Sequence, residues 1–150
     1  MIRTLALSLL ATLVSALEVS GAFARATAPG QGAAGVFMTL TNPGDQPVEL
    51  TGGSSARAGR VELHRTETGV DDIKRMVQQP SIIIPAKGQV LLAPGSLHMM
   101  LFDLTGPLVE GTTIDVELVA ADGAKTLAKV PVVWAGATEA PAGKPSCCCP

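Results

Sequence analysis

Hydrophobic and polar residues alternate in short runs along most of the chain, and turn-forming residues separate these runs. In the run 60–65, Val61 and Leu63 would face inward, whereas Glu62 and His64 would face outward. Such runs, rich in β-branched residues and bounded by Gly, Pro, Asn or Asp, predict strands. The predicted strands are residues 36–41, 48–51, 60–65, 82–84, 89–92, 97–104, 113–119 and 127–133.

Roughly eight or nine strands joined by tight turns predict an all-β domain, either a two-sheet sandwich or a small barrel. Residues 121–124 carry a hairpin signal between the last two strands. Helix signals are nearly absent, and the chain has no GxGxxG, P-loop or GxSxG motif. No nucleophile–base pair is evident either, so we expect a protein that is not an enzyme.

The first residues resemble an export signal. Arg3 precedes a short apolar run at residues 5–14, and small residues suit cleavage after Ala16 or after Ala24. We expect residues 1–16 to be a signal peptide, the alternative being a buried N-terminal helix. No later segment reaches the roughly 18 apolar residues of a membrane span. The mature form should therefore have no membrane span.

The other end of the chain differs in composition. Ala, Gly, Pro and Lys dominate there, which predicts a folded domain over residues 17–136 and a flexible tail over residues 137–150. The tail contains all three cysteines, Cys147, Cys148 and Cys149. They are a candidate auxiliary metal site, or they form intermolecular disulfides, or they have no role beyond the tail. Disulfides within the cluster are not expected, because adjacent cysteines pair poorly with one another.

Charge and aromatic content narrow the range of partners. The chain has 150 residues, enough for one domain, and a formal net charge of −2 with no cluster of Lys or Arg. This argues against nucleic acid, as do three Phe, one Trp and no Tyr, which offer few stacking surfaces for bases. The predicted domain also contains no thiol. An exported domain that binds a soft metal would then depend on methionine thioether.

The candidate chemistry lies in the strand 97–104. Alternation puts Leu97, Met99 and Leu101 on the core face. His98 and Met100 then share the other face, about 7 Å apart along the strand, where both can reach one ion.

The only other histidine is His64, also outward-facing, and Met76 follows a turn-rich stretch that would fold back as a hairpin or loop. Imidazole and thioether ligands select Cu(I), whereas a blue-copper site needs a Cys thiolate. We therefore expect a Cu(I) carrier rather than an electron-transfer protein. Taken singly, each His or Met is also compatible with an ordinary surface or core residue.

The spacing His64, eleven residues, Met76, twenty-one residues, His98, one residue, Met100 resembles the signature of the periplasmic PCu(A)C copper chaperones. The likeness extends from about Leu17 to Val133. It includes residues 24–30, 35–42, 61–64, 84–88, 92–100 and 107–111. Two positions depart from the family pattern. Arg65 stands where a further Met is optional, and Phe23 stands where Trp is usual.

The resemblance implies a cupredoxin-like Greek-key β-barrel that binds one Cu(I) near its surface. It implies a first strand at residues 17–24, which favours cleavage after Ala16. It also implies a periplasmic location and delivery of copper to the copper centre of cytochrome c oxidase, together with Sco-type thiol proteins. Two alternatives remain. One is periplasmic copper buffering or resistance through the same site, and the other is a β-sandwich interaction module without metal.

Overall fold

The computed structural model describes residues 17–140, and in this range it contains ten strands and no helix. The predicted signal peptide and the cysteine cluster lie outside the described residues. Within the described range no helix is long and apolar enough to cross a membrane. The strands are β1 (Glu18–Arg25), β2 (Ala33–Thr41), β3 (Val48–Ser55), β4 (Ala58–Thr68), β5 (Lys74–Gln79), β6 (Ile82–Ile84), β7 (Gln89–Leu92), β8 (Leu97–Leu104), β9 (Thr113–Ala120) and β10 (Lys125–Val133).

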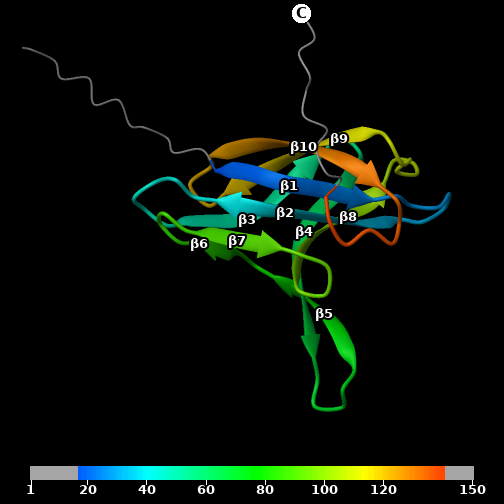
Figure 1. The fold of residues 1–150 in the computed structure, drawn as a ribbon, viewed down its shortest axis with the longest axis horizontal. Helices are drawn as coiled ribbons and strands as arrows, with labels where there is room; N and C mark the ends of the chain where they lie inside the picture. Colours follow the sequence, from blue (N-terminus) through cyan, green and yellow to red (C-terminus); the bar gives the residue numbers. More distant parts are fainter. Residues whose placement is uncertain (1–16, 141–150) are drawn as a thin grey trace, which may run out of the picture.

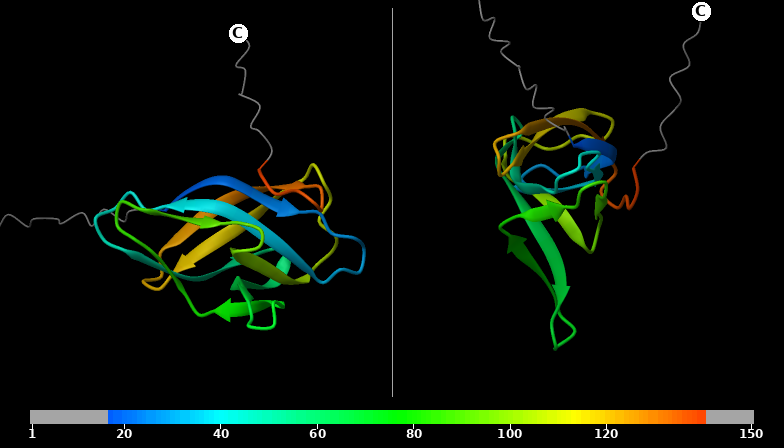
Figure 2. Two further views of the ribbon diagram at one scale, coloured as in Figure 1. Left: turned by 60° about the horizontal axis from the view of Figure 1, so that its bottom comes forward. Right: turned by 90° about the vertical axis from the view of Figure 1, so that its left-hand side faces the viewer.

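Seven of the strands close into a barrel. Their order is β4-β8-β2-β1-β10-β9-β3, and pairing between β3 and β4 completes the circuit (Figure 1). All neighbours are antiparallel except β1 and β10, which run parallel. Figure 2 shows the closed sheet from two further sides. The all-β, cupredoxin-like prediction is confirmed.

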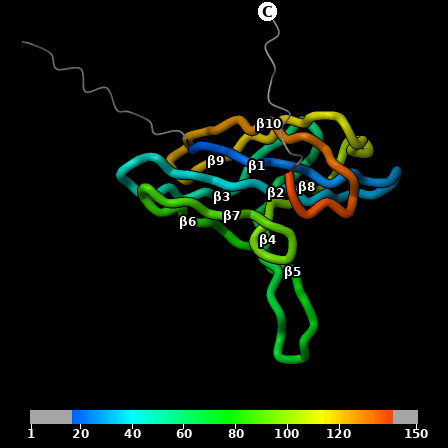
Figure 3. Tube along the Cα trace, viewed as in Figure 1, coloured from blue at the N-terminus to red at the C-terminus, as the bar shows by residue number. Residues whose placement is uncertain are grey.

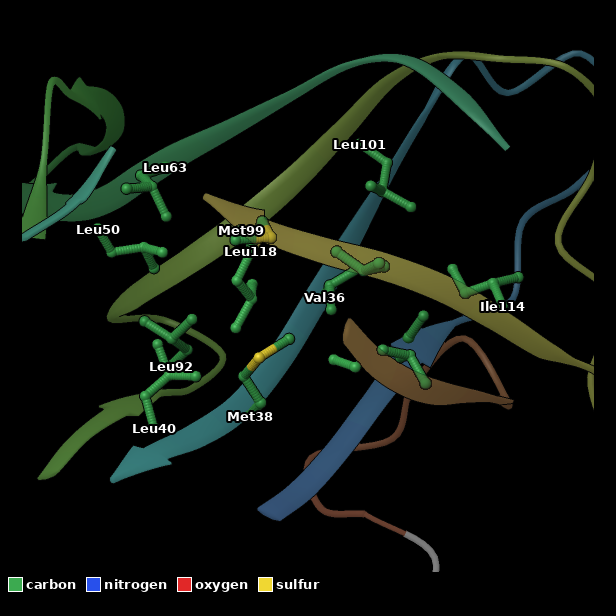
Figure 4. Close-up of a cluster of buried hydrophobic side chains, with 14 of the residues drawn as sticks. Val36, Met38, Leu40, Leu50, Leu63, Leu92, Met99, Leu101, Ile114 and Leu118 are labelled. Atoms are coloured by element: carbon green, nitrogen blue, oxygen red, sulfur yellow. The ribbon is translucent and has the colours of Figure 1, made fainter. Parts of the chain in front are cut away.

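Alternate side chains of the barrel strands point inward and form the core (Figure 4). The predicted inward face of β8 is confirmed, since Leu97, Met99 and Leu101 are 6%, 0% and 0% exposed. On β4, Leu63 is also buried. A two-residue period with one apolar face is thus enough to orient both strands that carry the histidines.

The remaining strands, β5, β6 and β7, are short additions to the barrel. β6 pairs with β3, β7 pairs with β2, and β5 pairs with β4. Alternation did not identify β5 as a strand, because five of its six residues are exposed and its polar pattern has no buried face. The hairpin or loop expected before Met76 is a hairpin, formed by β4 and β5.

The β4–β5 hairpin extends away from the barrel, as the tube in Figure 3 shows. Its pairing runs from Leu63 opposite Gln79 to Thr68 opposite Lys74. The base of the hairpin continues the barrel wall because β4 also pairs with β8 there. Side chains of β5 near this base can therefore share the outer face of β4 and β8.

Candidate metal centre

The two histidines lie directly opposite each other on neighbouring strands. In the antiparallel pairing of β4 with β8, the Cα of His64 is opposite that of His98. Both side chains point to the outer face, and their ring centroids are 6.2 Å apart. The strand parity predicted from the sequence is therefore right, and the pairing of the two strands brings the histidines together.

Met100 and Met76 lie on the same outer face as the histidines, at different levels along β4. Met100 is two residues beyond His98 on β8, and its strand position is opposite Glu62. Met76 on β5 is opposite Thr66 on β4, which makes Met76 a diagonal neighbour of His64. A cleft of about 740 Å³ is lined by Met76, His98 and Met100 among others. His64 adjoins this cleft through its contact with the His98 ring.

The four side chains differ sharply in exposure. Met76 is 60% exposed, whereas His98 is only 5% exposed. His98 therefore points away from the barrel core, as predicted, but is covered from outside. The outer face of the barrel is covered at this point, with the Phe37 ring 6.1 Å from the His98 ring.

The cover over Phe37 comes from both ends of the domain. Phe23 on β1 packs on Phe37, and Ala137, the first residue that the sequence assigned to the tail, belongs to the same buried cluster. The Arg25 guanidinium lies 5.2 Å from the centre of the Phe37 ring and donates from Nε to the carbonyl oxygen of Ala137 at 2.9 Å. In Figure 1 the segment after β10, orange to red, turns back over the barrel wall.

A tight turn determines which nitrogen of His98 is free. Nδ1 of His98 lies 2.8 Å from the carbonyl oxygen of Ser96. A carbonyl only accepts, so Nδ1 carries the proton and donates. The lone pair of neutral His98 is then on Nε2, the nitrogen available to a metal.

The turn that presents the Ser96 carbonyl contains Pro94 and Gly95, between the predicted strands 89–92 and 97–104. Ser96 N–H donates to the carbonyl of Ala93, and Gly95 has φ +78°, as a type II turn requires. The Ser96 oxygen also accepts from the Thr66 N–H on β4 at 3.1 Å. The orientation of the His98 ring is therefore tied to the barrel backbone.

The two ring nitrogens of His64 have different surroundings from those of His98. Its Nε2 lies 3.0 Å from Oε2 of Glu62, two residues earlier on the same strand face. Its Nδ1 is buried and, among the described residues, has no hydrogen-bond partner. The Phe102 ring lies 5.6 Å from the His64 ring and closes one side of the site.

The sequence patterns did not single out the cover over the site. Phe37, Arg25 and Gly35 all line the cleft, yet none belongs to the histidine and methionine spacing. Gly35 lies opposite Met100, and a Cβ there would come within 2.9 Å of the Phe37 ring. Finding them from the sequence would have required knowing that β2 lies beside β8.

The donor set is that of a soft metal. In residues 17–140, no group of three or more His, Cys, Asp or Glu side chains could hold a metal ion. Two imidazoles and two thioethers are instead gathered on one face. Such neutral, soft donors suit Cu(I), whereas Ca²⁺ and Mg²⁺ require oxygen ligands.

Known structures share this fold. The copper-bound PCuAC domain from PmoF2 aligns with a TM-score of 0.65 and 23% identity, over 79% of this chain and 92% of that domain. The solution structure of CuI-DR1885 from Deinococcus radiodurans aligns with a TM-score of 0.58 and 30% identity, over 83% of this chain and 84% of that one. The resemblance to PCu(A)C domains is confirmed.

Sequence comparison agrees with the structural one. A protein of Leifsonia xyli subsp. xyli described as "Putative lipoprotein Lxx21020" is 34% identical over 124 residues, which are 82% of this chain and 74% of that protein. The model of the family described as "Putative lipoprotein LpqE-like" matches residues 17–132. This match covers the barrel up to the penultimate residue of β10, including both strands with the histidines, and the chain therefore belongs to the LpqE-like family.

Proposed function

We propose that this protein is a copper carrier that binds one Cu(I) through His64, Met76, His98 and Met100. One observation carries the proposal. The pairing of β4 with β8 places the two histidines opposite each other, with ring centroids 6.2 Å apart, beside a cleft that both methionines line. Four neutral soft donors from three adjacent strands thus share one face.

The ligand types favour transport over redox chemistry. Residues 17–140 contain no cysteine, so they offer no thiolate for a blue-copper site. Thioethers are neutral whether or not they bind metal, so methionine sulfur need not take up a proton when the ion leaves. The solved structure of CuI-DR1885, at 30% identity, is of a protein described with Cu(I).

The differences in exposure suggest how the ion is exchanged. His98 is held in the wall of the barrel by its bond to Ser96, whereas Met76 faces solvent from the edge strand β5. A ligand side chain of the acceptor protein would bind the ion from the side of Met76 before the histidines dissociate from it. Copper would then pass between proteins without being released as the free ion.

The finer part of the proposal concerns place and partner. Residues 1–16 would direct export to the periplasm, and residues 17–136 would form the copper-binding domain. Residues 137–150 would form the tail, whose first residue, Ala137, is packed against the domain. The acceptor would be the copper centre of cytochrome c oxidase, served together with a Sco-type thiol protein. Copper buffering would use the same site but would retain the metal.

Titration with Cu(I) under reducing conditions, against a competing chelator, tests the site. The full chain with Cys147, Cys148 and Cys149 changed to Ser removes thiol binding by the tail. One tightly bound Cu(I) per chain is expected, and His64→Ala or Met100→Ala should weaken binding at least tenfold. Met99→Leu is the matched control, because Met99 is fully buried on the opposite face of β8. Wild-type affinity in either ligand variant would overturn the proposal.

A second experiment separates delivery from buffering. The copper-loaded protein is mixed with the soluble copper domain of the oxidase subunit, with and without a Sco-type protein, and the proteins are separated and assayed for copper. Transfer to the oxidase domain supports delivery. Retention of copper in the presence of both partners would support buffering instead.

A further inference from the structure

Glu62 is a carboxylate in direct contact with a proposed ligand. Its Oε2 lies 3.0 Å from Nε2 of His64, and its side chain is only 19% exposed. The two side chains are neighbours on one face of β4, two residues apart. The contact is therefore local to one strand.

A charge network holds this carboxylate in place from its other side. Arg60 donates from Nη1 to Oε1 of Glu62 at 2.8 Å and from Nε to Asp103 on β8 at 3.0 Å. The hydrogen bond that Arg60 donates to Asp103, followed by the charge of Glu62, raises the pKa of Arg60, which therefore remains a cation. The Arg60 guanidinium also lies 5.1 Å from the centre of the Phe102 ring. Glu62 thus has one oxygen bound to Arg60 and the other directed at His64.

The contact with Glu62 determines the tautomer of His64. An ionised carboxylate only accepts, so neutral His64 carries its proton on Nε2 and its lone pair on Nδ1. That Nδ1 is the buried atom without a hydrogen-bond partner among the described residues. A buried acceptor without a partner is normally costly, and a metal ion is a partner that would satisfy it. His98 shows the opposite arrangement, with Nδ1 bonded to Ser96 and Nε2 free.

We propose that Glu62 is a positioning residue that holds His64 ready to bind Cu(I) through Nδ1, while His98 binds through Nε2. The inference rests on the proposed function, since it assigns the ligand atoms of that same site. Metal-binding histidines commonly donate their second ring N–H to a carboxylate or a backbone carbonyl. Here His64 would use the carboxylate and His98 the carbonyl.

The tautomer can be measured without copper. Long-range ¹H–¹⁵N correlation spectra of the apo full chain distinguish the two ring nitrogens of each histidine. His64 is expected as the Nε2–H form and His98 as the Nδ1–H form. Glu62→Ala should give a mixture of tautomers at His64 alone. Glu67→Ala, which removes an exposed carboxylate from the same strand, should leave both spectra unchanged. An Nδ1–H form of His64 in the wild-type protein would overturn the inference.

Copper binding supplies the second test. Competition for Cu(I) against bicinchoninic acid should show a 10- to 100-fold weaker affinity in Glu62→Ala. Glu62→Gln, which keeps an oxygen that can accept from Nε2–H, should lie closer to wild type. Thermal unfolding of each apo variant shows whether the barrel is intact. Addition of Cu(I) to the wild type should shift the His64 Nδ1 resonance.

The outcomes also separate this inference from the proposed function. If the wild-type protein binds no Cu(I), the proposed function fails, whatever the tautomer. If it binds Cu(I) and the ion shifts Nε2 of His64, only the role of Glu62 fails. Equal affinity of the wild type and Glu62→Ala would also exclude a positioning role.

Discussion

His64 and His98 lie opposite each other on the neighbouring strands β4 and β8, and each has a different kind of hydrogen-bond partner. Glu62 contacts Nε2 of His64, and the Ser96 carbonyl accepts from Nδ1 of His98. The positions of the two rings are set by strand pairing, not by a loop. Substitutions in these strands, or in the residues that cover them, should therefore change the stability of the barrel or its affinity for Cu(I).

Removal of the His98 ring should destabilise the protein even without metal. The ring is 95% buried beneath Phe37, and its loss would leave a cavity and one fewer donor to the Ser96 carbonyl. We expect His98→Ala to lower the free energy of unfolding by about 1–3 kcal/mol. Urea unfolding of the apo protein measures this change. An unfolding free energy equal to that of the wild type would show that the site is not packed as described.

Gly35 should matter for copper binding more than for folding. An alanine Cβ at Gly35 would come within 2.9 Å of the Phe37 ring, which must then shift over His98 and Met100. We expect Gly35→Ala to weaken Cu(I) binding several-fold. Gly32→Ala is the matched control, because no atom lies within 4 Å of the added Cβ. Identical copper affinities of the two variants would contradict the prediction.

Met76 should be the first methionine of the domain to oxidise. It is 60% exposed, whereas Met38 and Met99 are 1% and 0% exposed. Treatment of the apo protein with hydrogen peroxide, followed by peptide mass spectrometry, should show sulfoxide at Met76 well before those two. The sulfoxide has lost the thioether donor, so oxidised protein should bind Cu(I) more weakly. Oxidation of Met38 at the same rate would mean that the barrel opens.

Leu63 should contribute strongly to the stability of the barrel. It lies on the inner face of β4 between Glu62 and His64 and is 1% exposed. We expect Leu63→Ala to lower the free energy of unfolding by about 2–5 kcal/mol. Leu127→Ala on β10, where the side chain is 58% exposed, should change it by less than about 0.5 kcal/mol. Chemical denaturation of both variants tests the difference.

Local patterns were sufficient to predict β8 and most of β4. Leu97, Met99 and Leu101 alternate with His98 and Met100, so the orientation of the histidine followed from the period of the strand. The turn at Pro94 and Gly95 likewise depends on neighbouring residues alone. These features depend only on residues that are close in sequence.

Features that depend on distant strands could not be predicted in this way. The burial of His98 depends on Phe37 of β2 and on the segment after β10, which no local pattern relates to β8. β5 lacked a buried face, so its pairing with β4 was visible only in the fold. The contact between Glu62 and His64 lay within reach of strand parity, although the pattern alone did not reveal its role.

Because β5 lies at the end of the sheet, the strand that carries Met76 is held by fewer hydrogen-bonded neighbours than the strands that carry the histidines. β4 and β8 have hydrogen-bonded neighbours on both sides, whereas β5 pairs only with β4. Exchange of Met76 for an incoming ligand would therefore break no contact within the closed barrel, but displacement of either histidine would disturb its wall. In a copper carrier built this way, Met76 would be the ligand that dissociates first, and His64 and His98 would stay bound longest. The order of ligand exchange would then follow from strand pairing.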